Sequence, residues 1–363
     1  MTIGPPQGDE RRPPCATTEL ISPAVTDERA QRAVRSEGVY AALDLGTNNC
    51  RLLVARPSRH GFRVIDAFSR IVRLGEGLGS SRRLRPQAMD RTIDALKVCR
   101  DKIAFRGVTR ARYVTTEACR AAENGEEFLA RIRAEIGLNL EVLDGQEEAH
   151  LAAAGCSVLA DRAADNVIVF DIGGGSTEMV WLRGAAAGEG TTRSRVAAWA
   201  SLTIGGVTLA ERHGGECVTP ESFEAMVDDV AGRLAPFRAA AAEALTGANF
   251  HLLGTSGTVT TLAGLHLGLA RYDRRQVDGL WMNDRQVDAV LNRLLAMSYA
   301  ERAANGCIGH ERADLVLPGC AIFEAIRRAF PTRRVRIADR GLREGILVEL
   351  MHADGAWSEG GRT

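Results

Sequence analysis

Two segments of this chain share one pattern, in which an apolar strand leads into Asp-x-Gly, then into small or hydroxylated residues, and then into a second apolar strand. They read AALDLGTNNCRLLVAR at residues 41–56 and IVFDIGGGSTEMVWLR at residues 168–183. An Asp-x-Gly turn lets backbone N–H groups and short side chains surround an anion, while the carboxylate holds a cation or a water beside it. We therefore expect two half-sites that face each other across one cleft and together bind a chain of phosphates.

The second turn carries the stronger signal. Its residues expected to bind phosphate are Gly173, Gly174, Gly175, Ser176 and Thr177. Three glycines allow a close approach of the backbone, and the two hydroxyls can donate to phosphate oxygens. Asp171 and Glu178 add carboxylates where Mg²⁺ would bind. The structural alternative is a tight turn with positive φ angles, but such a turn does not need an acid at both ends.

The first turn, DLGTNN, is weaker on its own, because Asp-x-Gly-Thr is common in purely structural turns. Its resemblance to the second turn favours a function. Asp44 is the corresponding carboxylate. The residues expected to bind phosphate here are Gly46, Thr47, Asn48 and Asn49.

The acid pair Glu147 and Glu148, in GQEEAH, falls in the first turn of an expected helix. Carboxylates are favoured there by the helix dipole, so an ordinary helix start is one interpretation. The pair also follows the last strand of the first half and precedes the second turn, where two lobes would meet. An ionised glutamate in that place is what a general base requires.

Two further features allow a functional and a structural interpretation. The string GTSGT, with Gly254, Ser256 and Gly257, is either a third anion-binding loop at a helix N-terminus or a capped helix start. Arg120, in TTEACR, either contacts a phosphate or covers the surface.

Composition sets the class of protein. The chain has 363 residues with 46 basic and 46 acidic side chains, so no global field directs it to nucleic acid or to a membrane. Eight cysteines show no C-x-x-C pair and no zinc-like spacing, which is typical of thiols in a reducing compartment. No segment is apolar enough to span a bilayer. Residues 1–37 predict a disordered tail, and we expect a cytoplasmic protein.

Strands and helices alternate along the rest of the chain, which favours the α/β class. Helices are expected at residues 86–105, 126–136, from about 146, and at 220–245, 283–298 and 313–330. Two arginine triplets could bind a trailing polyanion or simply be solvated. They are Arg82, Arg83 and Arg85, and Arg333, Arg334 and Arg336.

The ordered strings DLGTNN, TTEACRAAEN, GQEEAH, DIGGGSTE, SLTIGGVTLAERH, GTSGTVTTLA and DRGLREGIL closely resemble the exopolyphosphatase and guanosine pentaphosphate phosphohydrolase family. The resemblance implies two ribonuclease-H-like lobes of the actin, Hsp70 and sugar-kinase superfold with a cleft between them. Residues 38–147 plus about 346–357 would form the first lobe and residues 148–345 the second. By this resemblance we expect a short form of the family, without the additional C-terminal helical domains.

The resemblance also implies roles for individual residues. Asp44, Asp171 and Glu178 would serve Mg²⁺, Glu148 would be the catalytic base, and Arg120 would contact phosphate. The expected reaction is Mg²⁺-dependent hydrolysis of the terminal phosphoanhydride of polyphosphate, and a homodimer is plausible for the family. Guanosine pentaphosphate hydrolysis is the first alternative. An ATP-using kinase or ATPase, with GTSGT holding adenosine, and a non-catalytic phosphate sensor are more distant ones.

Overall fold

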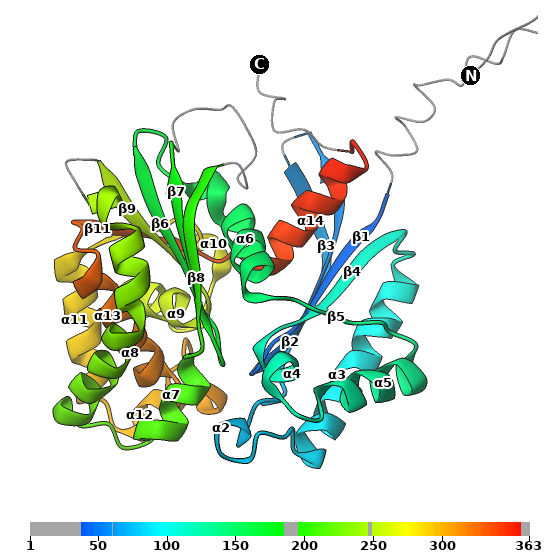
Figure 1. Cartoon of the computed structure of the whole chain (residues 1–363), viewed down its shortest axis with the longest axis horizontal. Coiled ribbons are helices and arrows are strands. Elements are labelled where there is room, and N and C mark those ends of the chain that lie inside the picture. Colours follow the sequence, from blue (N-terminus) through cyan, green and yellow to red (C-terminus); the bar gives the residue numbers. More distant parts are fainter. Residues whose placement is uncertain (1–37, 60, 185–194, 246–248, 357–363) are drawn as a thin grey trace, which may run out of the picture.

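The computed structural model describes residues 38–59, 61–184, 195–245 and 249–356. These residues form two lobes, each built around a mixed β-sheet, which stand side by side in Figure 1. The predicted tail at 1–37 lies outside the described residues. Strands and helices alternate in both lobes, so the predicted α/β class is confirmed.

The first sheet has the strand order β3-β2-β1-β4-β5 in the described residues. Strands β1 to β3 are antiparallel neighbours, whereas β4 and β5 continue parallel to β1. Its strands are β1 (Tyr40–Leu45), β2 (Asn49–Ser58), β3 (Gly61–Ile71), β4 (Arg110–Thr115) and β5 (Glu141–Val142).

The second sheet repeats this plan with the order β10-β11-β9-β6-β7-β8. Strands β6 to β8 form the antiparallel part, and β9 and β11 run parallel to β6. Its strands are β6 (Asn166–Ile172), β7 (Thr177–Arg183), β8 (Val196–Leu202), β9 (Phe250–Thr255), β10 (Trp281–Asn283) and β11 (Arg334–Ala338). The two Asp-x-Gly motifs are therefore equivalent hairpin turns, β1–β2 and β6–β7.

Helices cover both faces of each sheet. In the first lobe they are α2 (Leu78–Ser81), α3 (Pro86–Phe105), α4 (Glu117–Ala121) and α5 (Gly125–Ile136). Between the lobes lie α6 (Gly145–Cys156) and α14 (Leu342–Ala353). In the second lobe they are α7 (Gly206–His213), α8 (Pro220–Ala240), α9 (Gly257–His266), α10 (Arg274–Val277), α11 (Asp284–Ala296), α12 (Tyr299–Ala304) and α13 (Val316–Ala329). Short 3₁₀ turns occur at Ser157–Leu159, Ala242–Leu245 and His310–Arg312.

The alternation of side chains along the strands decides which helix packs where. On β6, Ile168 and Phe170 belong to the core under α8, α9 and α13, while Val167 and Val169 pack against α6 on the opposite face. In the first lobe, α3 and α5 cover one face, and α14 covers the other through residues such as Ile346. The cleft-side face of each sheet thus carries one helix, α14 or α6.

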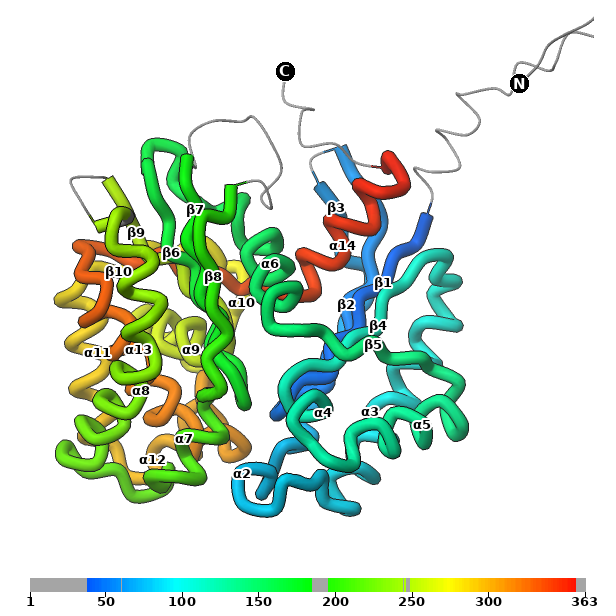
Figure 2. The backbone as a smooth tube through the Cα atoms, viewed as in Figure 1, coloured from blue at the N-terminus to red at the C-terminus, as the bar shows by residue number. Residues whose placement is uncertain are grey.

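Helices α6 and α14 cross in close contact between the two sheets, as Figure 2 shows. A Cβ atom on Gly155 would lie 2.0 Å from the carbonyl oxygen of Gly341, and one on Gly345 would lie 1.9 Å from that of Leu151. Only glycine allows this approach, because no real Cβ tolerates such distances. The crossing joins the two lobes behind the cleft.

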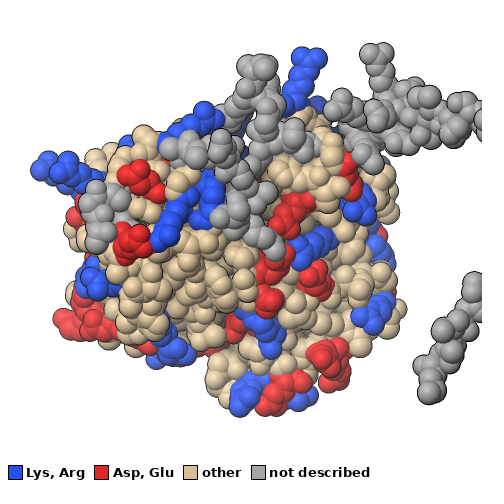
Figure 3. Space-filling view, turned by 45° about the horizontal axis from the view of Figure 1, so that its top comes forward, with Lys and Arg blue, Asp and Glu red and all other residues tan. Residues whose placement is uncertain are grey.

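The sequence predicted several helices well. Those expected at 86–105 and 126–136 are confirmed as α3 and α5. The helix expected at 313–330 begins only at Val316, because the chain before it forms the 3₁₀ turn His310–Arg312. Among the described residues, no helix is both long and apolar enough to cross a membrane. Acidic and basic side chains are intermixed on the face seen in Figure 3.

Candidate active site

The two Asp-x-Gly turns lie against each other. Each is closed by a backbone hydrogen bond, from Gly46 N to Asn49 O and from Gly173 N to Ser176 O, both 2.9 Å. A Cβ on Gly174 would come within 3.2 Å of Thr47 Cβ. The glycines of the second turn therefore let the two lobes approach where the turns meet.

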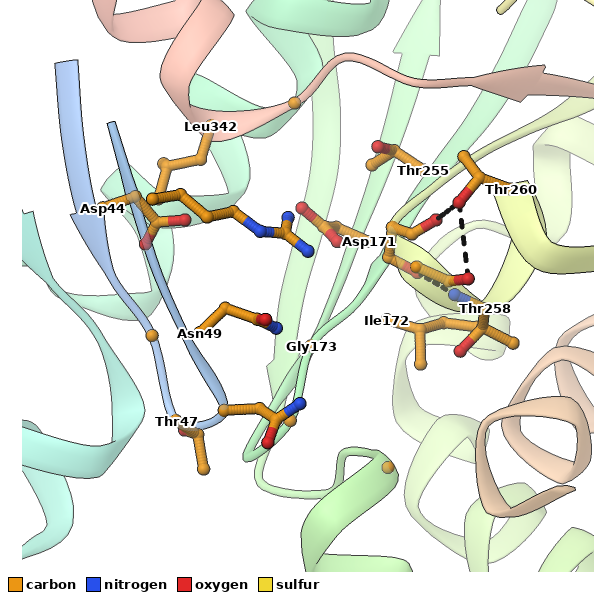
Figure 4. A pocket seen from close by; sticks show the side chains of 18 of the residues that line it. Asp44, Thr47, Asn49, Asp171, Ile172, Gly173, Thr255, Thr258, Thr260 and Leu342 are labelled. Carbon is orange, nitrogen blue, oxygen red and sulfur yellow. Dashed lines mark hydrogen bonds between the residues drawn. The ribbon is translucent and has the colours of Figure 1, made fainter. Parts of the chain in front are cut away.

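A cavity of about 740 Å³ opens between the lobes at this point. Figure 4 shows Asp44, Thr47 and Asn49 on one side, and Asp171, Ile172 and Gly173 on the other. The predicted site residues that line it are Asp44, Gly46, Thr47, Asn48, Asn49, Glu148, Asp171, Gly173, Gly174, Gly175, Ser176, Glu178, Ser256 and Gly257.

Two residues predicted to bind phosphate, Thr177 and Gly254, do not line this cavity. Thr177 is fully buried, and its hydroxyl donates to Ile204 O at 2.7 Å, because the strand alternation of β7 turns it to the face opposite to Glu178. Gly254 packs under the ring of Phe170, where a Cβ would lie 2.3 Å from Cζ. In this structure both residues serve packing and hydrogen bonding within the second lobe.

Arg120 does not line the cavity either. Its guanidinium forms ion pairs with Glu117 at 2.6 Å and with Glu148 at 3.1 Å. The arginine predicted to contact phosphate is thus already engaged by Glu117 of α4 and Glu148 of α6.

Asp44 and Asp171 face each other from β1 and β6. Burial raises the pKa of both carboxyls, that of Asp171 to about 6, and the negative charge of Asp44 adds to the shift of Asp171. The guanidinium of Arg51 opposes the shift in both cases. Two buried carboxylates that repel each other form a place where a cation is stabilised.

The cavity also holds the buried carboxyls of Glu148, Glu178 and Glu344, which are 8%, 3% and 3% exposed. Burial raises the pKa of Glu148 well above its usual value, with a further rise from Glu178, whereas Arg120 lowers it. Burial and Asp171 raise the pKa of Glu178 to about 8, although Ser201 Oγ donates to Glu178 Oε1 at 2.9 Å. Buried carboxyls with strongly raised pKa values are typical of sites of acid–base chemistry.

The third turn, between β9 and α9, reaches the cavity through Ser256 and Gly257. Ser256 has a φ of 105°, which is unusual for a residue other than glycine. Its side chain accepts a hydrogen bond from Thr258 N at 3.3 Å, so it caps α9. The capped helix start is confirmed, with Ser256 as the N-cap, and anion binding by this turn stays a prediction for a turn that lies at the cavity.

Sequence reasoning named none of the arginines that line the cavity, which are Arg51, Arg70, Arg274, Arg312, Arg340 and Arg343. Arg51 and Arg343 lie nearest to the acids of the two turns. The guanidinium of neither Arg51 nor Arg343 forms a hydrogen bond or ion pair within the described part of the chain, and both lie close enough to Asp44 to lower its pKa. Arg51 pairs directly with Asp44 across β1 and β2. Since paired residues of neighbouring strands share one face, strand alternation alone could have identified it.

The predicted arginine triplets lie elsewhere. None of their members lines the cavity. Arg82, Arg83 and Arg85 pair with surface glutamates, and Arg334 pairs with Asp161.

The acids do not form a ready-made metal centre. In the described residues no group of three or more His, Cys, Asp or Glu side chains could hold an ion by itself, so the predicted trio of Asp44, Asp171 and Glu178 does not converge. Mg²⁺, however, keeps several waters and is usually bound through one or two carboxylates together with substrate phosphates. The facing pair Asp44 and Asp171 fits that requirement.

Comparisons with known proteins agree with this geometry. A sequence model of the Ppx/GppA phosphatase family matches residues 53–354. "Exopolyphosphatase 2" of Mycobacterium tuberculosis is 31% identical over 327 residues, which are 85% of this chain and 98% of that protein. "Guanosine-5'-triphosphate,3'-diphosphate pyrophosphatase" of Photobacterium profundum is 30% identical over 317 residues, 86% of this chain, but the chain spans only 59% of its length.

Solved structures show the same similarity. The Aquifex aeolicus member of the Ppx/GppA family superimposes with a TM-score of 0.70 at 29% identity, over 87% of this chain and 98% of that one. An exopolyphosphatase from Cytophaga hutchinsonii superimposes with a TM-score of 0.78 over 88% of this chain and all of that one, and at 24% identity it supports the fold alone.

Proposed function

The chain belongs to the Ppx/GppA phosphatase family, and we propose that it is an exopolyphosphatase, which hydrolyses the terminal phosphoanhydride of inorganic polyphosphate and releases orthophosphate. Its two-lobed α/β fold is that of the actin, Hsp70 and sugar-kinase superfold. One observation carries the proposal: two Asp-x-Gly turns oppose each other across a cavity that also holds the buried carboxyl of Glu148.

The terminal phosphates would bind between the two turns. Backbone N–H groups of residues 174–176 and the side chains of Thr47 and Asn49 offer donors to phosphate oxygens, which such turns bind well. Arg51 and Arg343 supply positive charge that no carboxylate in the described residues takes up as an ion pair. Together these groups can neutralise a polyanion without a basic surface.

Glu148 is the proposed general base. Its buried carboxylate would accept a proton from the attacking water, and burial raises its pKa, which makes the carboxylate a stronger base. Glu178 would hold the position of that water. Asp44 and Asp171 would bind Mg²⁺, which when bound neutralises charge on the phosphate oxygens.

A guanosine pentaphosphate phosphohydrolase is the second candidate, because the relative with that printed activity covers most of this chain. It would cleave the same bond at the same turns. The ATP-using alternative places adenosine against the third turn, where Ser256 and Gly257 line the cavity.

The proposal includes the division of the chain into lobes at 38–147 plus about 346–357 and at 148–345. In support, Ile346 and Leu347 of α14 pack on the first sheet, whereas Ala149 and Ala153 of α6 pack on the second.

The proposal also includes a cytoplasmic location, in keeping with the free thiols of the cysteines in the described residues. A homodimer completes it, and sedimentation analysis tests that part.

A phosphate-release assay tests the function. Purified protein is incubated with polyphosphates of several lengths, guanosine pentaphosphate and ATP, each with and without Mg²⁺. We expect Mg²⁺-dependent release that is fastest with polyphosphate. Faster release from guanosine pentaphosphate would favour the second candidate, and release from none of the three would refute the hydrolase.

A further inference from the structure

Every nitrogen of the Arg120 guanidinium has an acceptor inside the first lobe or on α6. Nε and Nη2 both donate to Glu117 Oε2, at 3.1 and 2.6 Å, and Nη1 donates to Glu148 Oε2 at 3.1 Å. Nη1 also donates to the carbonyl oxygen of Leu143, just before α6. These bonds use four of the five guanidinium N–H groups, so Arg120 is engaged mainly by the protein.

Glu117 is itself held in place. Its side chain is only 14% exposed, and a Cβ on Gly175 of the second turn would lie 3.0 Å from Glu117 Cγ. The stem of Glu117 thus packs against the turn across the cleft, while its carboxylate holds Arg120. Glu117, Arg120 and Glu148 form a chain that starts at the phosphate-binding turn and ends at the proposed base.

From this chain we infer that Arg120 is a positioning residue for Glu148 and that Glu117 fixes Arg120 for that task. The inference rests on the proposed function. Arg120 binds only Oε2 of Glu148, and no other hydrogen bond to that carboxylate occurs within the described residues. Oε1 is therefore left to accept a proton from a water in the cavity.

The charges around Glu148 explain why such a partner is needed. Burial, Glu178 from β7 and Asp44 from β1 all favour the protonated carboxyl, and Arg120 from α4 favours the ionised form. A base must be ionised before the reaction. An arginine held in one orientation can do two things at once: it fixes the rotamer of Glu148, and it supplies the opposing charge.

The test separates this role from a direct phosphate contact. We would compare Arg120→Met, Arg120→Lys and Glu117→Gln for kcat, KM and the pH profile of kcat, with the substrate that the wild type hydrolyses best. The matched controls are Arg131→Met and Glu135→Gln, because Arg131 and Glu135 form an exposed ion pair at 2.6 Å on α5, in the same lobe. Circular dichroism checks that each variant folds.

If Arg120 positions the base, Arg120→Met lowers kcat about 10-fold or more, changes KM little, and moves the acid limb of the profile to higher pH. Arg120→Lys keeps the positive charge, so the acid limb of its pH profile lies close to that of the wild type. Glu117→Gln lowers kcat less, and the double variant is no worse than Arg120→Met, because both act through one chain. The α5 controls behave as wild type.

Two results would overturn the inference. A raised KM in Arg120→Met with an unmoved acid limb would show that Arg120 contacts substrate, and additive effects of Glu117→Gln and Arg120→Met would break the chain between them. In both cases an active wild type leaves the proposed function intact. A wild type that releases no phosphate from any of the substrates refutes that function and this inference together.

Discussion

Arg73 of the first lobe binds Asp314 of the second through both terminal nitrogens, each at 3.0 Å from a carboxylate oxygen. Nη2 also donates to the carbonyl oxygen of Glu311, at 3.0 Å. Four residues further along, Gly77 N donates to Glu211 Oε1 of α7 at 2.7 Å. These contacts tie the segment after β3 to the second lobe.

The same segment is bound to the first turn. The N–H groups of Val72 and Arg73 both donate to Asn48 O, at 2.9 and 3.1 Å, and Gly75 N donates to Thr47 O at 2.9 Å. The first turn and the contact between the lobes thus share one segment of the chain.

We expect Arg73 and Asp314 to be energetically coupled. In a double-mutant cycle of Arg73→Ala and Asp314→Ala, the coupling free energy of unfolding is about 1 kcal/mol, because the pair is bidentate but partly exposed. It is measured by urea unfolding and falls at high salt. Arg83 and Glu127, an exposed pair at 3.9 Å, serve as the control and show no coupling. An equal coupling in both pairs would contradict the expectation.

Glu148→Gln removes the proposed base with almost no change in shape. Turnover falls by about 10²–10⁴-fold, while substrate affinity stays close to that of the wild type. Phosphate release gives the first quantity and calorimetric titration with a short polyphosphate the second. Unchanged release from this variant would assign the base to another residue.

The raised pKa of Glu178 predicts how the stability of the protein depends on pH. This pKa of about 8 lies above the value of an unfolded chain, so the folded protein holds one more proton between about pH 5 and pH 8. Stability therefore falls as the pH rises through this window, by up to about 1.4 kcal/mol per pH unit for one proton. In Glu178→Gln, the free energy of unfolding, measured with urea, depends less on pH than in the wild type. In the exposed control Glu135→Gln it depends on pH as steeply as in the wild type. Parallel curves for both variants would argue against the raised pKa.

Gly345→Ala disrupts the crossing of α6 and α14. The added Cβ would lie 1.9 Å from Leu151 O, so the helices must separate, at a cost of about 1–3 kcal/mol in the free energy of unfolding. In Gly232→Ala on α8 the new Cβ meets nothing within 4 Å, and helix propensity makes that variant slightly more stable. Thermal unfolding of the two variants, with shifts of opposite sign, is the expected result.

Arg51→Met weakens substrate binding. Arg51 lines the cavity beside Asp44 and Asp171 and has no ion-pair partner in the described residues, so we expect it to bind phosphate. Loss of one charge-assisted hydrogen bond raises KM about 10-fold or more. Arg56→Met, on the same strand but away from the cavity, gives the wild-type KM. If both variants bind alike, Arg51 has only a structural role.

Local chemistry made part of this protein predictable from sequence. The two turns could be recognised because an aspartate, a glycine and short polar residues determine backbone conformation within a few positions. Helix α3 could be placed because Pro86 starts it and apolar residues such as Ile93 and Leu96 recur at helical spacing. Each of these signals lies within one segment.

The partners of the polar side chains were decided by the tertiary structure. Arg120 was expected to contact phosphate, but it pairs with Glu117 three residues before it on α4 and with Glu148, which comes near only because the start of α6 packs close to α4. Arg51 lies within strand β2, and only the packing of the two lobes shows that it lines the cavity. A charged group takes the nearest opposite charge in space, and sequence distance carries almost no information about which group that is.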